Sequence, residues 1–365
     1  MKRNLLMLLP VFLMALAIIP QQADCGRLSS GQLPPRKVVI GTAIHGYYGV
    51  KYPGLDQRLT EVEGLIDEVA RECGRKYPDD GLDLVVLPEE IITIGKGRTA
   101  KTRSVRLEGP VLDRMGGKAR QYNTYIIVPL DLAEADGTSA NAAVLLDRKG
   151  EVAGIYRKVH LVASPGLKDL EGGHTPGKTF PVFECDFGRI AIQICFDLSF
   201  PDGWKALAEK GAEIVAVPTM SPQTSRPSAY ALQGRYYVVT SNHRNNATVF
   251  NPAGRIDAQI VDGDNDVSVG GLKLTQNSVL VHRIDLSYAI VPWSGTLGDG
   301  QKFTKKYGDR VGYTYYRDED FGIFWSNDPD IPISRMVKEL ELWEFEEYLE
   351  SVRLFQDKAR GGAAR

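Results

Sequence analysis

The feature that most constrains this chain is an alternation of short apolar runs with longer helical stripes, which begins near residue 37. Apolar runs of strand length cover residues 38–44 and 82–87, and a stripe with helical spacing covers residues 55–77 between them. Strands that alternate with helices are typical of α/β organisation. The pattern therefore predicts an α/β fold.

Turn sequences interrupt this alternation and predict hairpins among the helical crossovers. They occur at residues 147–150, 186–188 and 251–254, each between β-rich arms. Hairpins and crossovers together indicate a mixed sheet in a layered fold, not a purely parallel, doubly wound one. Further helices are expected at 111–122 and 203–210, and further strands at 125–130, 189–194, 213–217, 236–240 and 279–286.

The pattern changes beyond Pro292. Glycine and tyrosine become frequent, strands are expected to end with the run at 279–286, and a helical stretch around residues 340–349 closes the chain. The aromatic residues of this part are too many for a disordered tail. We therefore expect one main domain over residues 36–290 and a C-terminal extension over 291–365 that packs on the domain or on a partner subunit.

The first 24 residues have the features of a secretory signal peptide. Lys2 and Arg3 precede an apolar run from Leu5 to Ile19, which is short for a membrane span. We expect an exported protein, periplasmic or secreted, with no stable membrane span after cleavage. Cys25 raises the alternative of a lipid anchor, but Asp24 departs from the small residues that such a site prefers.

The charge of the chain argues against a nucleic-acid partner. The formal net charge is −2, and no run of like charges marks an interaction tail. A nucleic-acid backbone requires a basic surface, which this composition does not offer. We expect a small, neutral or mildly charged substrate.

Four cysteines in an exported chain would ordinarily suggest disulfides. Cys73, however, lies on the helical stripe of residues 55–77, and Cys185 shares a strand face with Phe183 and Phe187. Both are expected to be buried thiols.

Three predicted buried strands are each followed directly by a polar residue. Residues 84–88 precede Glu89, residues 155–157 precede Lys158, and residues 190–194 precede Cys195. Strand ends are where α/β folds place functional side chains. A thiol, a carboxylate that takes its proton and a cation that stabilises an anion form a complete set for nucleophilic catalysis.

In three motifs the sequence resembles the nitrilase, or carbon–nitrogen hydrolase, superfamily. They are Leu-Pro-Glu (87–89), Tyr-Arg-Lys-Val-His-Leu (156–161) and Ile-Cys-Phe-Asp-Leu-Ser-Phe-Pro-Asp (194–202), in the family order. The resemblance covers residues 37–290 and implies the family's αββα sandwich. It also implies that Glu89 is the general base, Lys158 the oxyanion stabiliser and Cys195 the nucleophile.

The resemblance further implies a second glutamate between the lysine and the cysteine, ahead of a Pro-Gly pair. Glu171 precedes Pro176-Gly177 and is the candidate, either to orient Lys158 or to assist proton transfer. Glu90 competes with Glu89 as the base, but the family places the base directly after proline. The family also implies a homodimer or larger homo-oligomer. No cofactor or metal is expected, because no His/Cys/Asp cluster has ligand spacing.

The implied reaction is hydrolysis of a non-peptide carbon–nitrogen bond in an amide or N-carbamoyl compound or, less favoured, a nitrile. Residues 196–202 resemble the amidase and carbamoylase branches, whereas true nitrilases tend to have Trp-Glu after the cysteine. Ser199 stands where members that bind a substrate carboxylate often carry arginine. A carboxylate-bearing substrate would need Arg226, Arg235 or Arg244 as a substitute.

Three alternatives use the same residues differently. A soluble acyltransferase would transfer the acyl group of the thioester to an amine. A non-catalytic relative would keep the pocket without turnover, but the intact Glu89, Lys158 and Cys195 argue against that alternative. A Cys-His thiol enzyme would need one of four histidines as its base, although no spacing selects one: His160, His174, His243 and His282.

Overall fold

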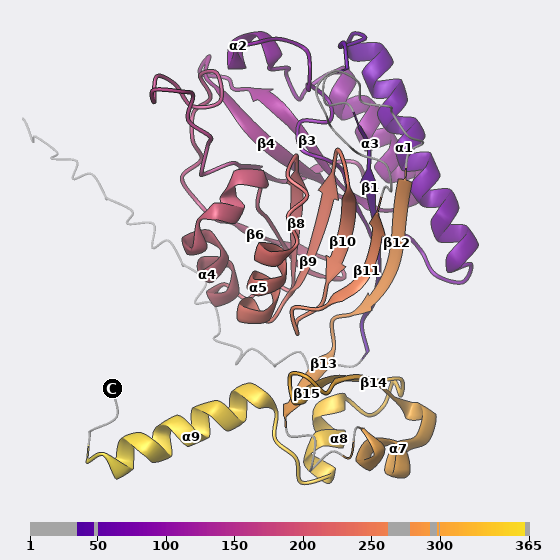
Figure 1. The fold of residues 1–365 in the computed structure, drawn as a ribbon. Helices are drawn as coiled ribbons and strands as arrows, with labels where there is room; N and C mark the ends of the chain where they lie inside the picture. The colour runs from indigo at the N-terminus through magenta and orange to yellow at the C-terminus, as the bar shows by residue number, and fades with distance from the viewer. Residues whose placement is uncertain (1–34, 47–49, 262–277, 293–297, 299, 362–365) are drawn as a thin grey trace, which may run out of the picture.

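The computed structural model describes residues 35–46, 50–261, 278–292, 298 and 300–361 (Figure 1). The predicted signal segment and Cys25 lie outside these residues. Within the described part of the chain, no helix is long and apolar enough to cross a membrane.

One branched sheet of 12 strands forms the centre of the molecule. Its strands follow the order β5-β4-β3-β2-β1-β9-β8-β7-β6, with β12 paired to β1, β10 to β9, and β11 to β10. The bounds are β1 (Lys37–Ile44), β2 (Leu84–Val86), β3 (Tyr125–Ala133), β4 (Ser139–Leu146), β5 (Val152–Arg157), β6 (Val182–Cys185), β7 (Gly188–Ile192), β8 (Ile214–Thr219), β9 (Tyr237–Asn242), β10 (Asn246–Phe250), β11 (Ile256–Val261) and β12 (Ser278–Asp285).

The sheet is mixed, as predicted. β1 to β3 run parallel to one another, as do β7 to β9, and the two halves meet at the single parallel pair Ile44–Asn242. The hairpins β4–β5, β6–β7 and β10–β11 are antiparallel and turn at the three predicted sites. At the first of these turns, the Asp147 carboxylate accepts the backbone N–H groups of Lys149 and Glu151.

The two ends of the sheet face each other across a central core. Tyr156 on β5 and Ile190 on β7 belong to the same buried cluster, although these strands lie far apart in the strand order. Gly154 on β5 lies directly under the ring of Phe183 on β6, since a Cβ atom built on Gly154 would be 2.3 Å from that ring. The sheet is therefore folded into two layers around this core.

Helices cover both outer faces. α1 (Leu55–Lys76) and α3 (Pro110–Tyr122) cover one layer, and α4 (Pro201–Glu209) and α5 (Ser225–Gly234) cover the other (Figure 1). The order helix, sheet, sheet, helix confirms the predicted αββα sandwich. The predicted helical stripe becomes the buried face of α1, which includes Leu59, Val62, Leu65, Ile66, Val69 and Cys73.

The expectation that strands end at residue 286 is wrong. β13 (Tyr288–Pro292), β14 (Val311–Tyr316) and β15 (Phe321–Ser326) form a second sheet, packed with α7 (Gln301–Tyr307) and α8 (Ile333–Glu339). The predicted boundary at residue 290 falls within β13. The frequent glycines of this part do not end the strands. Gly312 and Gly322 each give space to an aromatic ring, and a Cβ atom on Gly312 would lie 2.2 Å from the Trp325 indole.

Two helices also differ from the prediction. The expected helical stretch around residues 340–349 is interrupted, because α8 ends at Glu339 and α9 (Phe345–Ala359) begins only at Phe345. α5 was not predicted, and only Pro227 and Ala231 of its ten residues are buried, which leaves too weak an apolar stripe to recognise. The remaining short elements are α2 (Ala100–Arg103), η2 (Cys195–Ser199) and η3 (Gly308–Arg310).

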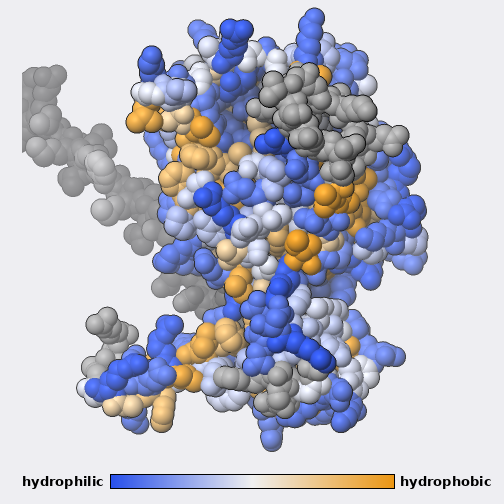
Figure 2. All heavy atoms as spheres, viewed as in Figure 1, coloured by the Kyte–Doolittle hydropathy of each residue, from blue (hydrophilic) through white to orange (hydrophobic). Residues whose placement is uncertain are grey.

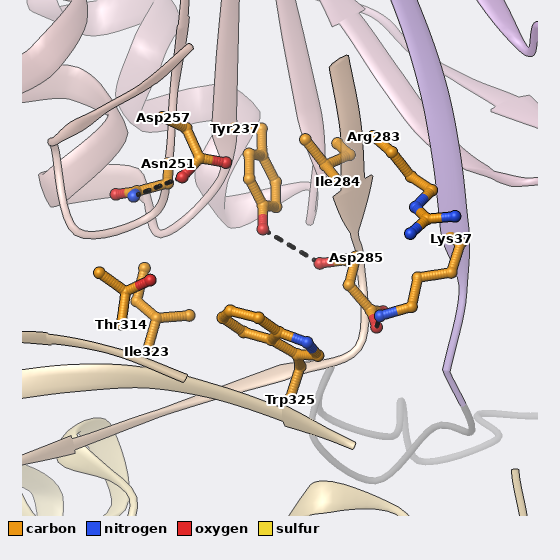
Figure 3. A pocket seen from close by; sticks show the side chains of 10 residues that line it. All are labelled: Lys37, Tyr237, Asn251, Asp257, Arg283, Ile284, Asp285, Thr314, Ile323 and Trp325. Carbon is orange, nitrogen blue, oxygen red and sulfur yellow. Dashed lines mark hydrogen bonds and ion pairs between the residues drawn. The ribbon is translucent and has the colours of Figure 1, made fainter. Parts of the chain in front are cut away.

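A polar cavity of about 160 Å³ lies where the second sheet meets β1 and β12 (Figure 3). Lys37 pairs with Asp285 at 2.7 Å, and the Tyr237 hydroxyl donates to the Asp285 carbonyl at 3.1 Å. Trp325 closes the cavity from the C-terminal side, 5.9 Å from the Lys37 ammonium. Because these charged groups pair with one another, the cavity is a polar junction between the two sheets.

Gly41 on the central strand β1 permits the close approach of α1. A Cβ atom there would lie 2.2 Å from Cγ1 of Val69, which is fully buried. We expect Gly41→Ala to lower the free energy of unfolding by ~1–3 kcal/mol, because the core has no room for the methyl group. Urea unfolding measures this change.

Gly64→Ala is the matched control for Gly41→Ala. Gly64 lies on α1 with open space around it. Alanine is the better helix former, so the free energy of unfolding should rise by ~0.5–1 kcal/mol. Equal effects at the two positions would contradict the packing described for β1 and α1.

Candidate active site

The four residues predicted for the site line one cavity of about 270 Å³. Glu89 follows β2, Lys158 follows β5, Cys195 follows β7, and Glu171 lies in the loop between β5 and β6. The full lining consists of Glu89, Glu90, Arg103, Lys158, Val162, Glu171, Cys195 and Met220. The three strand ends that sequence analysis identified separately therefore meet in space.

Lys158 is buried between two carboxylates. Its Nζ donates to Oε1 of Glu89 at 2.9 Å and to Oε1 of Glu171 at 2.6 Å, and only 2% of its side chain is exposed. Burial alone would lower the pKa of Lys158, but the negative charges around it, Glu89 first, hold that pKa well above its ordinary value. Lys158 therefore stays cationic at neutral pH.

Asn141 on β4 holds both carboxylates in place. Its Nδ2 donates to Oε1 of Glu89 at 3.0 Å and to Oε2 of Glu171 at 3.1 Å. Its backbone carbonyl accepts the N–H of Lys158 at 2.9 Å. Sequence analysis missed this residue, and the only signal was a polar side chain between the apolar residues that follow Ser139 in β4.

The other oxygen and the backbone of Glu89 are also fixed. The Met220 N–H donates to Oε2 of Glu89 at 3.1 Å. The ring of His243 lies between two carbonyl oxygens, that of Glu89 at 2.6 Å and that of His45 at 2.8 Å. Burial lowers the pKa of His243 to about 4, so at neutral pH the ring donates to only one of them. The buried His243 ring thus packs directly against the backbone that carries the carboxylate.

Cys195 begins the short helix η2 with a left-handed backbone, at φ 42°. Burial, and then the charge of Glu89, raise its pKa to about 12, against the opposing charge of Lys158. The thiol is therefore protonated at neutral pH. A nucleophilic attack by Cys195 requires a base that takes the proton as the new bond forms.

Asp197 holds the turn that carries Cys195. Its buried carboxylate accepts the N–H of Ile194 at 2.9 Å, the N–H of His160 at 2.9 Å and the hydroxyl of Tyr156 at 2.7 Å. Sequence analysis recognised Asp197 only as part of a motif. The contacts show that it joins the nucleophile turn to the segment that carries Lys158.

The histidines do not form a Cys-His pair in the described structure. His160 contacts Asp197, His174 contacts Asp131, and His282 contacts Asp257. His243 contacts only backbone carbonyls, and the cavity lining includes no histidine. These contacts argue against the Cys-His alternative.

A second buried cluster adjoins the cavity. Glu90, Asp131 and His174 offer ligand atoms within 4.8 Å of one another, a spacing that suits a metal ion. Arg103 already supplies positive charge there, with its Nε 3.2 Å from Oδ1 of Asp131. Burial, and then the charges of Asp131 and Glu89, raise the pKa of Glu90 well above its ordinary value. The cluster is best described as a buried ion and hydrogen-bond network.

Residues 27–289 match the carbon-nitrogen hydrolase family, which is most of the chain. The chain belongs to this family. It is 28% identical over 172 residues to a deaminated glutathione amidase from Yersinia enterocolitica, which covers 44% of this chain and 60% of that protein. It is 31% identical over 199 residues to a nitrilase from Pyrococcus abyssi, which covers 51% of this chain and 69% of that protein.

Solved structures of the superfamily share the fold. An amidase from Nesterenkonia sp. superimposes with a TM-score of 0.55 at 20% identity, over 70% of this chain and 94% of that one. The nitrilase-superfamily member Nit3 of Saccharomyces cerevisiae superimposes with a TM-score of 0.53 at 16% identity, over 69% and 90% of the two chains. The αββα sandwich of this carbon-nitrogen hydrolase is thus the fold of its superfamily.

Replacing Asp197 tests its role as an anchor. We expect Asp197→Asn to lower the free energy of unfolding by ~1–3 kcal/mol, because an amide nitrogen would face buried N–H donors. Asp202→Asn is the matched control, since Asp202 contacts the same His160 ring at 3.4 Å but is 60% exposed. That change should stay within ~0.5 kcal/mol. Equal losses for both variants in urea unfolding would contradict the anchor.

The pH dependence of stability tests the His160 contact. The hydrogen bond to Asp197 raises the pKa of His160. The stabilisation is therefore fully present below the unfolded-state pKa of ~6.5 and is lost as the pH rises through the higher folded-state value. The stability advantage of wild type over His160→Gln should shrink across that window. A difference that does not change with pH would contradict the assignment.

Proposed function

We propose that this protein hydrolyses the carbon–nitrogen bond of a small amide or N-carbamoyl compound through a thioester on Cys195. One observation carries the proposal: the Glu89–Lys158–Glu171 ion cluster lines the same cavity as the cysteine. The cavity thus joins a nucleophile, a carboxylate to act as its base and a permanent cation. Family membership supports the same reaction class.

In the first half-reaction, Glu89 takes the thiol proton of Cys195 as the sulfur attacks the amide carbon. The oxyanion that forms lies against Lys158 and the backbone N–H that follows the cysteine. An ammonium group has three protons. Two of them point to Glu89 and Glu171, so the third is available for the oxyanion. The carbon–nitrogen bond then breaks, and the proton on Glu89 passes to the leaving nitrogen.

In the second half-reaction, water attacks the thioester. Glu89 takes a proton from the water, the carbon–sulfur bond breaks, and the Cys195 thiolate recovers the proton. The products are a carboxylic or carbamic acid and ammonia or an amine. Covalent catalysis replaces one difficult displacement with two easier ones. Glu171 is the positioning residue in this scheme, because its bond to Lys158 keeps the ammonium fixed through both steps.

The surroundings of Ser199 bear on the substrate. Arg226 donates to the Ser199 hydroxyl at 2.9 Å, whereas Arg235 pairs with Glu346 near the C-terminal helix. Arg226 is therefore the one of these two that lies at Ser199, and Arg244 is the third predicted substitute. Arg226 is exposed, and neither it nor Ser199 lines the cavity of Cys195, so this contact does not favour a carboxylate-bearing substrate.

Export and self-association are further parts of the proposal. The predicted signal segment, residues 1–24, supports a function outside the cytoplasm, and the mature N-terminus in the native host tests it. An N-terminus at Met1 would contradict export. We also propose that the protein is at least a homodimer.

Ammonia release from a panel of amides, N-carbamoyl compounds and nitriles tests the nucleophile. We expect Cys195→Ala to reduce release to the uncatalysed background. Cys185→Ala is the matched control, because Cys185 is a free thiol outside the cavity, and it should keep wild-type activity. Equal release from wild type and Cys195→Ala would rule out the thiol mechanism.

Intact-mass measurement tests the thioester. In Glu171→Gln, the Lys158 ammonium loses the carboxylate that holds it in position, so both half-reactions should slow and turnover should fall by ~10²-fold or more. Acid quenching during this slow turnover should trap an acyl adduct on Cys195, and Glu108→Gln, an exposed glutamate, should behave as wild type. Partition of the adduct to an added amine in place of water would favour the acyltransferase alternative.

A further inference from the structure

Glu90 lines the cavity of Cys195 but has no role in the proposed mechanism. It follows Glu89 directly in the sequence, and only 8% of its surface is exposed. Its backbone is left-handed, at φ 51°, a conformation that costs free energy for a residue other than glycine. The fold thus holds a buried carboxyl group at the cavity, and a buried carboxyl group needs partners.

The hydrogen-bond donors beside Glu90 also serve other groups. The Asn141 amide has two protons, yet three carboxylates surround it. Its Nδ2 lies 3.0 Å from Glu89, 3.1 Å from Glu171 and 3.4 Å from Glu90. Nη2 of Arg103 lies 3.9 Å from Oε1 of Glu90 and donates to the Glu171 carbonyl at 3.0 Å. Within the described part of the chain, the Glu90 carboxyl has no other hydrogen bond or ion pair.

Acids outnumber bases among the described residues that line this cavity or pair with its lining. Lys158 lies between two carboxylates, and Arg103 pairs with Asp131 at 3.2 Å. Even with His174 counted as a base, four acids face three bases: Glu89, Glu90, Asp131 and Glu171 against Lys158, Arg103 and His174. Burial, and then the charge of Asp131, raise the pKa of Glu90, so it holds a proton more tightly than an ordinary glutamate. The acids therefore favour a positive charge beside Glu90.

The uncharged part of the lining suits an aliphatic chain. Val162 and Met220 supply apolar side chains to the cavity. Val162 belongs to the loop between β5 and β6, which also exposes Leu167. Apolar side chains gather at the upper left of Figure 2, where this loop lies in Figure 1. At about 30 Å³ for each heavy atom, the volume of one water in the liquid, the cavity of about 270 Å³ takes on the order of nine heavy atoms.

We propose that Glu90 binds an ammonium group at the far end of the substrate, which makes the substrate a short aliphatic amide with a terminal amine. This inference rests on the proposed function and narrows its substrate class. The amide carbon lies at Cys195, the methylene groups lie against Val162 and Met220, and the ammonium lies at Glu90. On binding, the ammonium takes the place of the Glu90 proton, which passes to the solvent. The ion pair that forms compensates the buried carboxylate.

A carboxylate on the substrate would bind Arg103 instead, and two observations argue against it. Arg103 already pairs with Asp131 and donates to the Glu171 carbonyl. A further anion would also add to the excess of acids around the cavity. A metal ion would need Asp131 and His174, and neither lines the cavity. An ammonium group therefore fits these surroundings best.

Three amides of equal chain length test the ammonium site: pentanamide, its derivative with a terminal amine, and the monoamide of glutaric acid. In wild type, kcat/KM for the amino amide should exceed that for pentanamide by ~10-fold or more, as expected for a hydrogen bond to a charged group. Glu90→Gln should remove most of this preference, mainly through KM, because glutamine has the shape of the protonated acid but cannot become charged. Glu108→Gln removes an exposed charge outside the cavity and should keep the preference.

This preference separates the ammonium site from the proposed function. If Cys195→Ala stops ammonia release but Glu90→Gln keeps the wild-type preference, hydrolysis stands and the ammonium site is wrong. A wild-type preference for the glutaric monoamide would also overturn the site and would favour Arg103. If none of the three amides is hydrolysed, the proposed function fails for this class, and binding to Cys195→Ala then decides the role of Glu90.

Calorimetry of Cys195→Ala measures binding of the amino amide without turnover. In mildly acidic buffers the ligand amine is fully charged, so a proton released on binding comes from the protein. The dependence of the heat on the ionisation enthalpy of the buffer should show this release. Adding Glu90→Gln to Cys195→Ala should weaken binding by ~10-fold or more and abolish the release, which a merely structural role would not do. Equal affinities of the two variants, or binding without release of a proton, would overturn the proposal.

Discussion

The Lys158 ammonium lies between the carboxylates of Glu89 and Glu171 with 2% of its side chain exposed. Removing such charges from water costs several kcal/mol for each ion unless partners compensate. The cluster joins the end of β2, the end of β5 and a loop, so the compensation exists only when all three segments are in place. Its geometry therefore depends on the whole sandwich and not on any one element.

The residues around the Glu89–Lys158–Glu171 cluster restrict the movement of its charged groups. Asn141 bonds both carboxylates, Met220 bonds the second oxygen of Glu89, and His243 contacts its backbone. A carboxylate that keeps these partners has few other orientations available. Fixed charges of this kind stabilise a developing anion without reorganising during the reaction.

The same electrostatics keeps the Cys195 thiol protonated in the free protein. Burial and the nearby Glu89 raise the pKa of the thiol to about 12, so a free thiolate is rare. A thiol in this state resists adventitious oxidation, which follows thiolate character and exposure. In the proposed mechanism, Glu89 removes the proton only as the sulfur forms its bond to the substrate carbon, and Lys158 then faces the new oxyanion.

The sequence predicted the parts of this site that depend on local pattern. Strand ends indicated Glu89, Lys158 and Cys195, the family resemblance added Glu171, and helical spacing located α1. The roles of Asn141, Asp197 and His243 were not predicted, because their contacts join distant parts of the sequence. The contact of Asn141 with Glu171 spans 30 residues, that of Asp197 with Tyr156 spans 41, and that of His243 with Glu89 spans 154. Such partners are set by the folded sheet and leave no periodic signal.

The C-terminal sheet was missed for the opposite reason. A local sequence signal, the frequent glycines, was present, and it argued against strands. Gly312 and Gly322 are turn formers by propensity, yet in β14 and β15 they lie under Trp325 and Phe324. A bulky ring on one strand needs a small residue opposite or beside it. Glycine at these positions therefore makes room for a ring and does not form a turn. Aromatic residues interleaved with glycine are therefore compatible with strands, and the aromatic content of the extension was the sounder guide to its order.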